Sequence, residues 1–244
     1  SGAITLSNAG VNLSGTVAEL KAALAGTITS HTGTITISDA AATDITATDI
    51  TTINTASTGA ITVTNAIDIN GSGSEVSAAF TAIDTNTGNA TAHVTGNDYT
   101  VAQLKSINDA TTGAIVLANA GVALTGDSTD IAAAFAGTVT THTGTVAVTN
   151  NDYTLAELVT INNASTGAIT LTTQDKALTG SGSDLAAALT ATINYTGAVT
   201  VSGTDYTAAQ LKTINDTTSG AITLSNAGVN LSGTVAQLKA GFAG

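Results

Sequence analysis

Short stretches of alternating apolar and hydroxyl-bearing residues recur along the chain, and each begins just after a glycine. The apolar positions are rich in Ile and Val, and the strict period of two predicts short β-strands with one apolar and one polar face. The clearest examples are residues 4–7, 35–38, 61–64, 199–202 and 222–225. Asn, Asp or Gly stands at the sixth place after seven of the nine glycines. Such residues end strands in tight turns.

These glycines define nine repeat units in which long and short units alternate. They are Gly2, Gly33, Gly59, Gly88, Gly113, Gly144, Gly167, Gly197 and Gly220. Their spacings are 31, 26, 29, 25, 31, 23, 30 and 23 residues, so the true repeat is a pair of units. Residues 219–244 repeat residues 1–26 with three changes, in which Gln237, Gly241 and Phe242 replace Glu19, Ala23 and Leu24.

A short helix is predicted later in every unit, because a capping residue precedes an acid or amide by three positions. The first side chain accepts from the backbone N–H of the second residue, whose side chain reaches back to the cap. The nine pairs are Thr16/Glu19, Thr46/Asp49, Ser72/Glu75, Thr100/Gln103, Asp127/Asp130, Thr154/Glu157, Ser181/Asp184, Thr207/Gln210 and Thr234/Gln237. The short units add the spacing of a hydrophobic staple across the cap, in Ile45/Ile50, Tyr99/Leu104, Tyr153/Leu158 and Tyr206/Leu211.

A strand, a turn and a capped helix in each unit predict the α/β class, as a solenoid of about nine strand–helix coils. Its strands are expected to stack in one parallel sheet, with long and short coils alternating. Residues 1–244 are then a single repeat domain, interpreted as a segment of a longer array. Long units also contain a second alternating stretch, at 11–13 and 122–124, which is either an extra strand or a wider loop.

The composition and net charge exclude several classes of function. The 244 residues include 17 Asp and Glu against 5 Lys, with no Arg, for a net charge of −12. This balance offers no phosphate-neutralising patch, so nucleic acid is not an expected partner. No apolar run approaches the roughly 20 residues of a membrane span, and the absence of Cys excludes disulfides and thiolate chemistry. No catalytic motif stands in its required setting, so we do not expect an enzyme.

The acidic residues are the candidates for metal binding. Seven of them belong to the predicted helix caps, and a further set stands two residues before the cap in every short unit. This set is Asp44, Asp98, Asp152 and Asp205. A turn-forming role is favoured over a contribution to calcium binding, because calcium prefers six to eight oxygen ligands. No other cofactor is expected. His31 and His142 occupy equivalent places four units apart, too far for a shared metal.

Hydroxyl groups on the outer face of successive strands form a candidate binding surface. Its members are Thr5, Thr36, Thr62, Thr64, Thr170, Thr172, Thr200 and Thr223. Regular Thr-x-Thr rows resemble the ice-binding faces of antifreeze proteins. The row is interrupted by His93, Val116 and Ala147, so a soluble, β-branched sheet face is the favoured interpretation. Binding of ice or of a glycan is the alternative.

The recurring TGAITL and AAQLKTIND segments, low in aromatic residues and sulfur, resemble the Thr/Ala/Gly-rich tandem repeats of bacterial giant extracellular proteins, including cyanobacterial surface proteins. This resemblance covers essentially the whole chain. It implies a secreted, cell-surface or matrix-forming role, with no catalytic residues to carry over.

Both ends of the predicted stack are apolar. Solenoids normally end in polar capping repeats, yet the first and last units carry Ile4, Leu6, Leu224, Val235, Leu238 and Phe242. We therefore expect the chain to contact copies of itself head to tail. The function predicted from the sequence is a structural module of an extracellular filament, fibre or surface layer.

Overall fold

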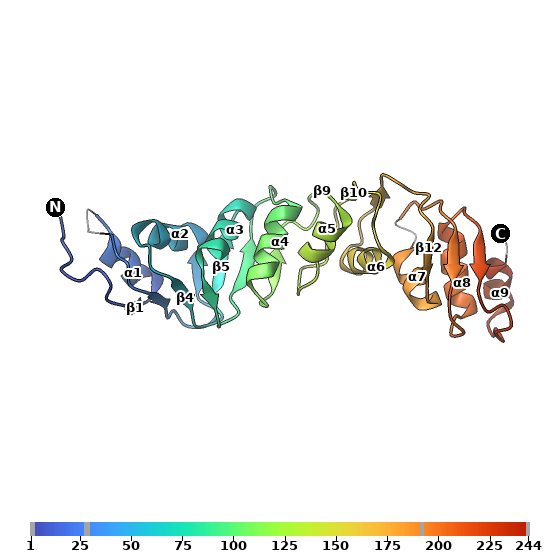
Figure 1. The fold of residues 1–244 in the computed structure, drawn as a ribbon, viewed down its shortest axis with the longest axis horizontal. Helices are drawn as coiled ribbons and strands as arrows, with labels where there is room; N and C mark the ends of the chain where they lie inside the picture. Colours follow the sequence, from blue (N-terminus) through green and yellow to red (C-terminus); the bar gives the residue numbers. More distant parts are fainter. Residues whose placement is uncertain (1–2, 27–29, 191–192, 243–244) are drawn as a thin grey trace. The chain divides into compact units, whose positions relative to one another are not determined.

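The computed structural model describes residues 3–26, 30–190 and 193–242, so the first repeat glycine, Gly2, lies outside the described residues. Contacts within the chain divide it into two compact bodies. The N-terminal body is residues 1–119 with 137–140, and the C-terminal body is residues 120–136 with 141–244. Each body is a mixed α/β structure in which short helices alternate with short parallel strands (Figure 1). The predicted α/β class is therefore confirmed.

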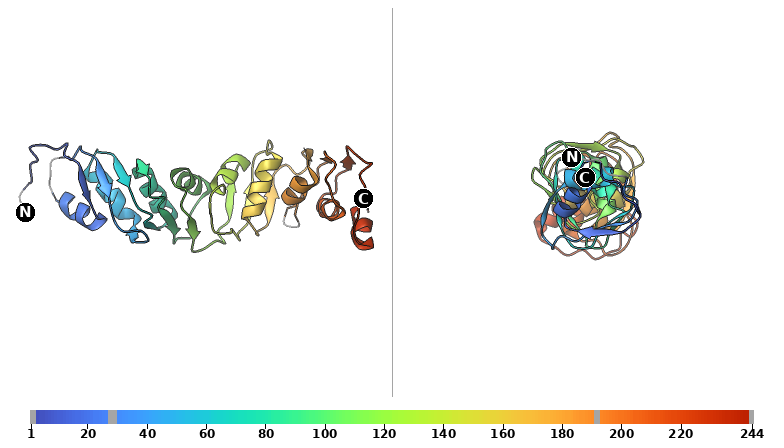
Figure 2. Two further views of the ribbon diagram at one scale, coloured as in Figure 1. Left: turned by 90° about the horizontal axis from the view of Figure 1, so that it is seen from below. Right: turned by 90° about the vertical axis from the view of Figure 1, so that its left-hand side faces the viewer.

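The N-terminal body contains four helices and two parallel sheets among its described residues. The helices are α1 (Val17–Leu24), α2 (Ala47–Ala56), α3 (Gly73–Ala82) and α4 (Val101–Ala110), and they pack side by side in chain order (Figure 2). One sheet has the order β1 (Leu13–Gly15), β2 (Ile35–Ile37), β4 (Ile61–Val63) and β6 (Thr85–Asn86). The other has the order β3 (Asp44–Thr46), β5 (Asp68–Gly71), β7 (Thr91–Val94) and β8 (Ile115–Leu117).

The C-terminal body repeats this plan in its described residues. Its helices are α5 (Ser128–Ala134), α6 (Leu155–Ala164), α7 (Gly182–Ala188), α8 (Ala208–Thr217) and α9 (Val235–Gly241), each packed against the next. One sheet has the order β9 (Leu124–Gly126), β10 (Val146–Val148) and β11 (Ile169–Leu171). The other has the order β12 (Leu178–Gly180), β13 (Val199–Val201) and β14 (Ile222–Leu224).

The core of each body lies between the strands and the helices. In six strands the first and third residues are buried and the middle residue is more exposed, as the alternating pattern predicts; these strands are β2, β4, β8, β10, β11 and β13. Ile35 is level with Ile61, and Val199 is level with Ile222, so aliphatic side chains form columns along the sheets. Helical residues such as Leu104 close the core from the other side, and the two halves of each predicted staple are buried.

The prediction of one stacked sheet is wrong, because the strands of the described residues divide among four sheets. Two strands that each follow a repeat glycine pair with one another only across a short unit, as β2 pairs with β4 and β13 with β14. Paired strands start 21 to 26 residues apart along the chain. A long unit of 29 to 31 residues exceeds that distance, so the next glycine-led strand enters a different sheet.

The second alternating stretch of each long unit solves this mismatch. The structure shows that it is an extra strand, since β1 and β9 include Leu13 and Leu124. β1 pairs with β2 and β9 pairs with β10, so the extra strand receives the glycine-led strand of the following unit.

The strand predicted at 4–7 is absent apart from a single bridge at Ile4. The same sequence at 222–225 does form a strand, β14, because β13 lies beside it and supplies backbone hydrogen bonds. Local sequence is insufficient for a strand of three residues; its partner decides whether it forms.

Side-chain length separates two kinds of helix cap. All six caps followed by Glu or Gln at the third helical position form both hydrogen bonds, at Thr16, Ser72, Thr100, Thr154, Thr207 and Thr234. The three caps followed by Asp do not: Asp127 and Ser181 accept the helix N–H alone, and Thr46 makes no side-chain cap bond. The Asp side chain is one methylene shorter than that of Glu or Gln, so its carboxylate does not reach back to the backbone N–H of the cap residue. The predicted capping box is confirmed for the first group, Asp127 and Ser181 show a variant of it that keeps the bond from the helix N–H, and the prediction is wrong at Thr46.

The repeat glycines are required by close contact between neighbouring backbones. A Cβ on Gly59 would lie 1.6 Å from the Gly33 carbonyl oxygen, and one on Gly167 would lie 1.8 Å from that of Gly144. Both distances are far inside van der Waals contact, and the obstructing atoms belong to backbone. A side chain therefore fits at these positions only if two units move apart.

We expect Gly59→Ala to lower the free energy of unfolding by about 1–3 kcal/mol, the usual cost of forcing extra atoms into a packed site. Gly228→Ala is the matched control, because nothing lies within 4 Å of its Cβ position. Urea denaturation followed by circular dichroism measures both. Equal stability of the two variants would contradict the close-contact explanation.

Candidate functional site

The predicted hydroxyl surface is divided into short ladders. In the N-terminal body Ser14, Thr36, Thr62 and Thr85 are level on successive strands. In the C-terminal body Thr179, Thr200 and Thr223 are level in one sheet, whereas Thr170 lies beside Ala147 in the other. These ladders have three or four positions because each sheet has only three or four strands.

Three remaining members of the predicted surface lie outside these ladders. The Thr64 hydroxyl donates to the Ile37 carbonyl at 3.2 Å, and the Thr172 hydroxyl donates to the Val148 carbonyl at 3.1 Å. Thr5 is exposed in a segment that is not a strand. The hydroxyl-bearing residues therefore do not form one continuous row in either body.

The calcium candidates are separated in the same way. Asp44 accepts from Asn70 Nδ2 at 3.1 Å and is level with Asp68 on the next strand. Asp152 accepts from Asn150 Nδ2 at 2.6 Å. Asp98 and Asp205 lie in the segments just before α4 and α8. Among the described residues, no three His, Asp or Glu side chains gather in a way that could hold a metal ion. A calcium contribution stays a prediction.

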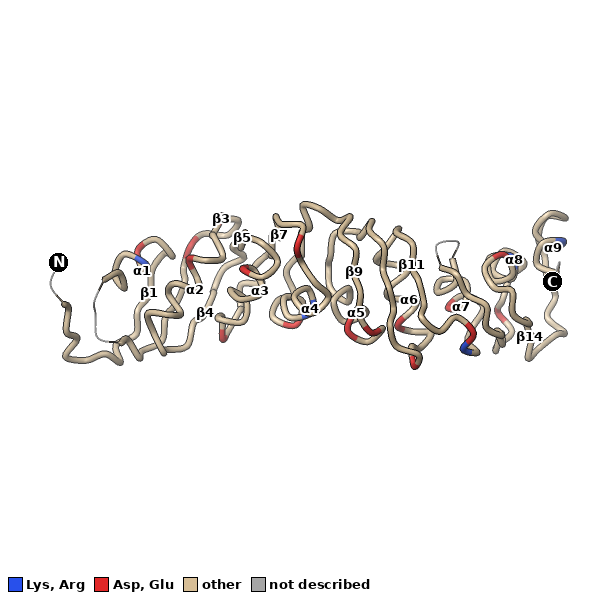
Figure 3. Tube along the Cα trace, turned by 90° about the horizontal axis from the view of Figure 1, so that it is seen from above, with Lys and Arg blue, Asp and Glu red and all other residues tan. Residues whose placement is uncertain are grey.

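An acidic cleft of 440 Å³ lies in the N-terminal body. Three of its lining carboxylates already have partners within the protein: Asp39 accepts from the Val17 N–H at 2.8 Å, Asp49 pairs with Lys21, and Asp44 binds Asn70. Figure 3 shows acidic residues distributed over the helices and loops of both bodies. The cleft is therefore part of the packing between α1 and α2.

Polar side chains are instead concentrated where one repeat unit meets the next, and we call these contacts joints. In the first kind, the hydroxyl of a buried tyrosine donates to a backbone carbonyl 20 residues later. Tyr99 donates to Asn119 and Tyr153 to Thr173, each at 2.7 Å, and Tyr206 donates to Asn226. Burial, and secondarily the charge of Asp175, raise the pKa of Tyr153 to about 12, so its hydroxyl stays protonated as a donor.

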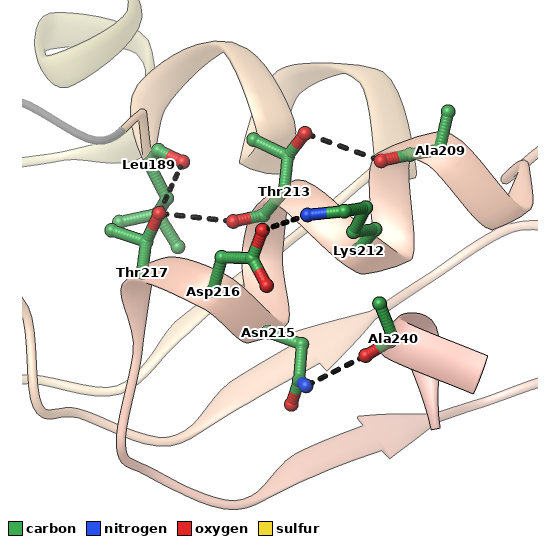
Figure 4. Close-up of polar contacts among 8 residues, drawn as sticks. All are labelled: Leu189, Ala209, Lys212, Thr213, Asn215, Asp216, Thr217 and Ala240. Atoms are coloured by element: carbon green, nitrogen blue, oxygen red, sulfur yellow. Dashed lines mark hydrogen bonds and ion pairs between the residues drawn. The ribbon is translucent and has the colours of Figure 1, made fainter. Parts of the chain in front are cut away.

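The second kind of joint joins neighbouring helices. Asn162 Nδ2, in α6, donates to the Ala187 carbonyl of α7 at 2.6 Å. Asn215 Nδ2, in α8, donates to the Ala240 carbonyl of α9 at 2.9 Å (Figure 4). Each asparagine thus donates to a carbonyl in the last turn of the next helix, where the regular intrahelical hydrogen bonds end.

The third kind of joint lies two residues before the glycine that follows each short unit, where a buried Ser or Thr hydroxyl anchors the turn. Gly59 N–H donates to Ser57 Oγ at 3.0 Å, and Gly220 N–H donates to Thr218 Oγ1 at 2.9 Å. The Thr218 hydroxyl in turn donates to the carbonyl of Gly197, the preceding repeat glycine, at 2.8 Å. The Ser57 hydroxyl likewise donates to the His31 carbonyl, two residues before Gly33, at 3.1 Å. These hydroxyls therefore link the turn at one repeat glycine to the turn at the glycine before it.

The two equivalent histidines occupy this same position in long units. His31 Nε2 lies 2.7 Å from the Val11 carbonyl oxygen, and its Nδ1 lies 2.9 Å from Ser57 Oγ. His142 Nε2 lies 2.8 Å from the Val122 carbonyl oxygen, but its buried Nδ1 has no hydrogen-bond partner. Because a carbonyl only accepts, the His142 proton sits on Nε2.

Sequence reasoning missed these roles, although the signal is present. Tyr stands at one place in three of four short units, and an Ile-Asn pair stands near the end of all four short-unit helices. The tyrosines were predicted only as the apolar half of a staple. Their hydroxyl partners lie in the next unit, so an argument confined to one unit does not find them.

Among residues 3–26, 30–190 and 193–242, exposed large apolar side chains occur only in the two end segments, 1–26 and 219–244. Within the described part of the chain these side chains are Ile4, Val11, Val235 and Phe242. The other predicted end residues, Leu6, Leu224 and Leu238, are partly exposed. A cleft of 340 Å³ lined by Ile4, Leu6 and Leu24 lies at the first segment, and one of 480 Å³ lined by Leu224 and Phe242 lies at the last.

Comparison with protein-family models, curated proteins and solved structures gives no match. No helix in the described ranges has the length and apolar character needed to cross a membrane. The geometry of the joints and of the end segments therefore carries the functional argument.

The joint at His142 predicts a dependence of stability on pH. Burial lowers the pKa of His142, and the hydrogen bond to Val122 opposes this only in part. The unfolded chain therefore takes up the proton first, so stability is full above about pH 6.5 and is lost as the pH falls through that value.

We expect His142→Tyr to remove this loss while preserving the joint. Tyr195 already occupies the equivalent place in the next long unit, and its hydroxyl donates to the Lys176 carbonyl. Urea denaturation of both proteins at about pH 7.5 and pH 5 gives the comparison, since the carboxyl groups contribute equally to each. An identical pH dependence in the two proteins would refute this role of His142.

Proposed function

We propose that the chain is a structural solenoid module that binds copies of itself end to end, forming an extracellular filament, fibre or surface layer. The observation that carries this proposal is that, in the part of the chain that the structure describes, the exposed large apolar side chains lie in the two end segments. A patch of exposed apolar side chains on an otherwise polar surface is typical of an interaction site.

The joints give a second reason. A tyrosine, an asparagine or a buried hydroxyl of one unit binds a backbone group of its neighbour, so the hydrogen bonding of each unit is completed by the units beside it. Among the described residues, each end segment has such a neighbour on one side. Contacts between two different faces that do not close into a ring produce open filaments.

An extracellular setting is supported by the resemblance to bacterial surface repeats. The use of buried hydroxyl and imidazole groups within joints supports a structural role over catalysis. The product of such a protein is its shape and its self-association.

We expect Val235→Asp to raise the concentration needed for assembly by about tenfold or more, because burying a valine is worth about 1.5–3 kcal/mol. Ala236→Asp is the matched control. It adds the same charge one position away, where the equivalent residue of α1, Ala18, stays exposed. Sedimentation velocity over a range of concentrations, with negative-stain microscopy, measures assembly. An intact chain that sediments as a 23.6 kDa monomer at every concentration would overturn the proposal.

A further inference from the structure

The two end segments have nearly the same sequence but form complementary halves of one unit. Leu13–Gly15 is strand β1 because β2 lies beside it, whereas the equivalent residues 231–233 are not a strand. Conversely, Ile222–Leu224 is strand β14 beside β13, whereas residues 4–6 are not a strand. Each segment thus forms the strand whose neighbour is present.

The helices of the two segments show the same asymmetry. α1 is covered by α2 of the following unit, and Val17 and Leu24 are only 3% and 6% exposed. α9 packs against α8 of the preceding unit, and the equivalent Val235 and Phe242 are 82% and 60% exposed. The covering that α9 lacks is therefore the one that residues following position 26 give to α1.

Alternation of unit length fixes which surface supplies that covering. Residue 244 is equivalent to residue 26, so the last segment belongs to a long unit. A short unit follows every complete long unit in the chain, and the first of these short units begins at Gly33. Docking residues 1–26 of a second copy onto the last segment would place two long units in succession, which occurs nowhere in the sequence.

We propose that copies of this chain assemble by exchange of end segments: residues 219–244 of one copy replace residues 1–26 of the next. This inference rests on the proposed function and specifies its contact. Residues 231–233 then pair with β2 of the second copy as β1 does, and α9 covers its α2. Lys239 reaches Asp49 of the second copy, as Lys21 does within one chain.

The three sequence differences are compatible with this replacement. Glu19 and Gln237 complete the same type of capping box. The larger Phe242 replaces Leu24, while the adjacent Gly241 is smaller than Ala23, so the added volume is partly offset. One fully covered segment replaces two half-covered segments, and the displaced residues 1–26 regain conformational freedom.

Disulfide trapping tests the exchange in the full-length protein, because the chain has no cysteine of its own. Ser14 and Thr36 are level on β1 and β2. Residues that are level on adjacent strands are close enough for a disulfide to join them. The double variant Ser14→Cys with Thr36→Cys is the control and should cross-link within one chain. A mixture of Ser232→Cys chains with Thr36→Cys chains should give a covalent dimer joined through these two positions, identified by peptide mass spectrometry.

A mixture of Ser232→Cys with Thr5→Cys chains tests direct docking of the unexchanged ends, because the glycine-led strand that follows a long unit pairs with that unit's extra strand. We expect no cross-link between these positions. If this pair cross-links in place of 232 with 36, the exchange is wrong although end-to-end assembly stands. The same conclusion follows if the chains assemble and neither pair cross-links. If the control forms but every mixture remains monomeric, both the exchange and the proposed function fail.

Discussion

The close approach of neighbouring backbones at the repeat glycines is the constraint on which the rest of the structure depends. At Gly59, Gly167 and Gly220 the space for a Cβ is occupied by the carbonyl of the previous glycine in the same ladder. Glycine is the residue that tolerates such approach. With the backbones this close, strands of only three residues pair over their whole length, and side chains of one unit reach the backbone of the next.

The joints explain how polar side chains are buried in a small core without the free-energy cost of unpaired hydrogen-bonding groups. A buried donor or acceptor is costly when unpaired, and each unit leaves carbonyls at its strand ends and helix ends. Tyr153 satisfies one such carbonyl across a unit boundary, and Asn215 satisfies another. His142 is the exception, because its Nδ1 is buried without a partner where His31 has Ser57. Hydrogen bonding and packing thus extend from unit to unit, which explains why an end segment is structurally incomplete.

Much of the local structure is predictable from the sequence, and the failures have physical causes. The helices, the positions of their N-caps and the buried faces of the strands follow from short-range rules. The reciprocal cap at Thr46 fails because Asp49 is short and pairs with Lys21 instead. The single sheet fails because a long unit exceeds the distance between paired strands, so β11 and β13 enter different sheets. The row of Thr residues is divided for the same reason.

The sequence by itself determined the repeat, the α/β class, the helix starts and the apolar character of both ends, since each depends on residues a few positions apart. The tertiary structure alone decided which strands pair, which carbonyls Tyr99 and Asn162 bind, and which half of each end segment is a strand. Those outcomes depend on groups about 20 or more residues away, brought close only by the stacking of units. The same sequence is a strand at 222–224 and not at 4–6, because a backbone hydrogen bond needs a partner that local sequence does not supply.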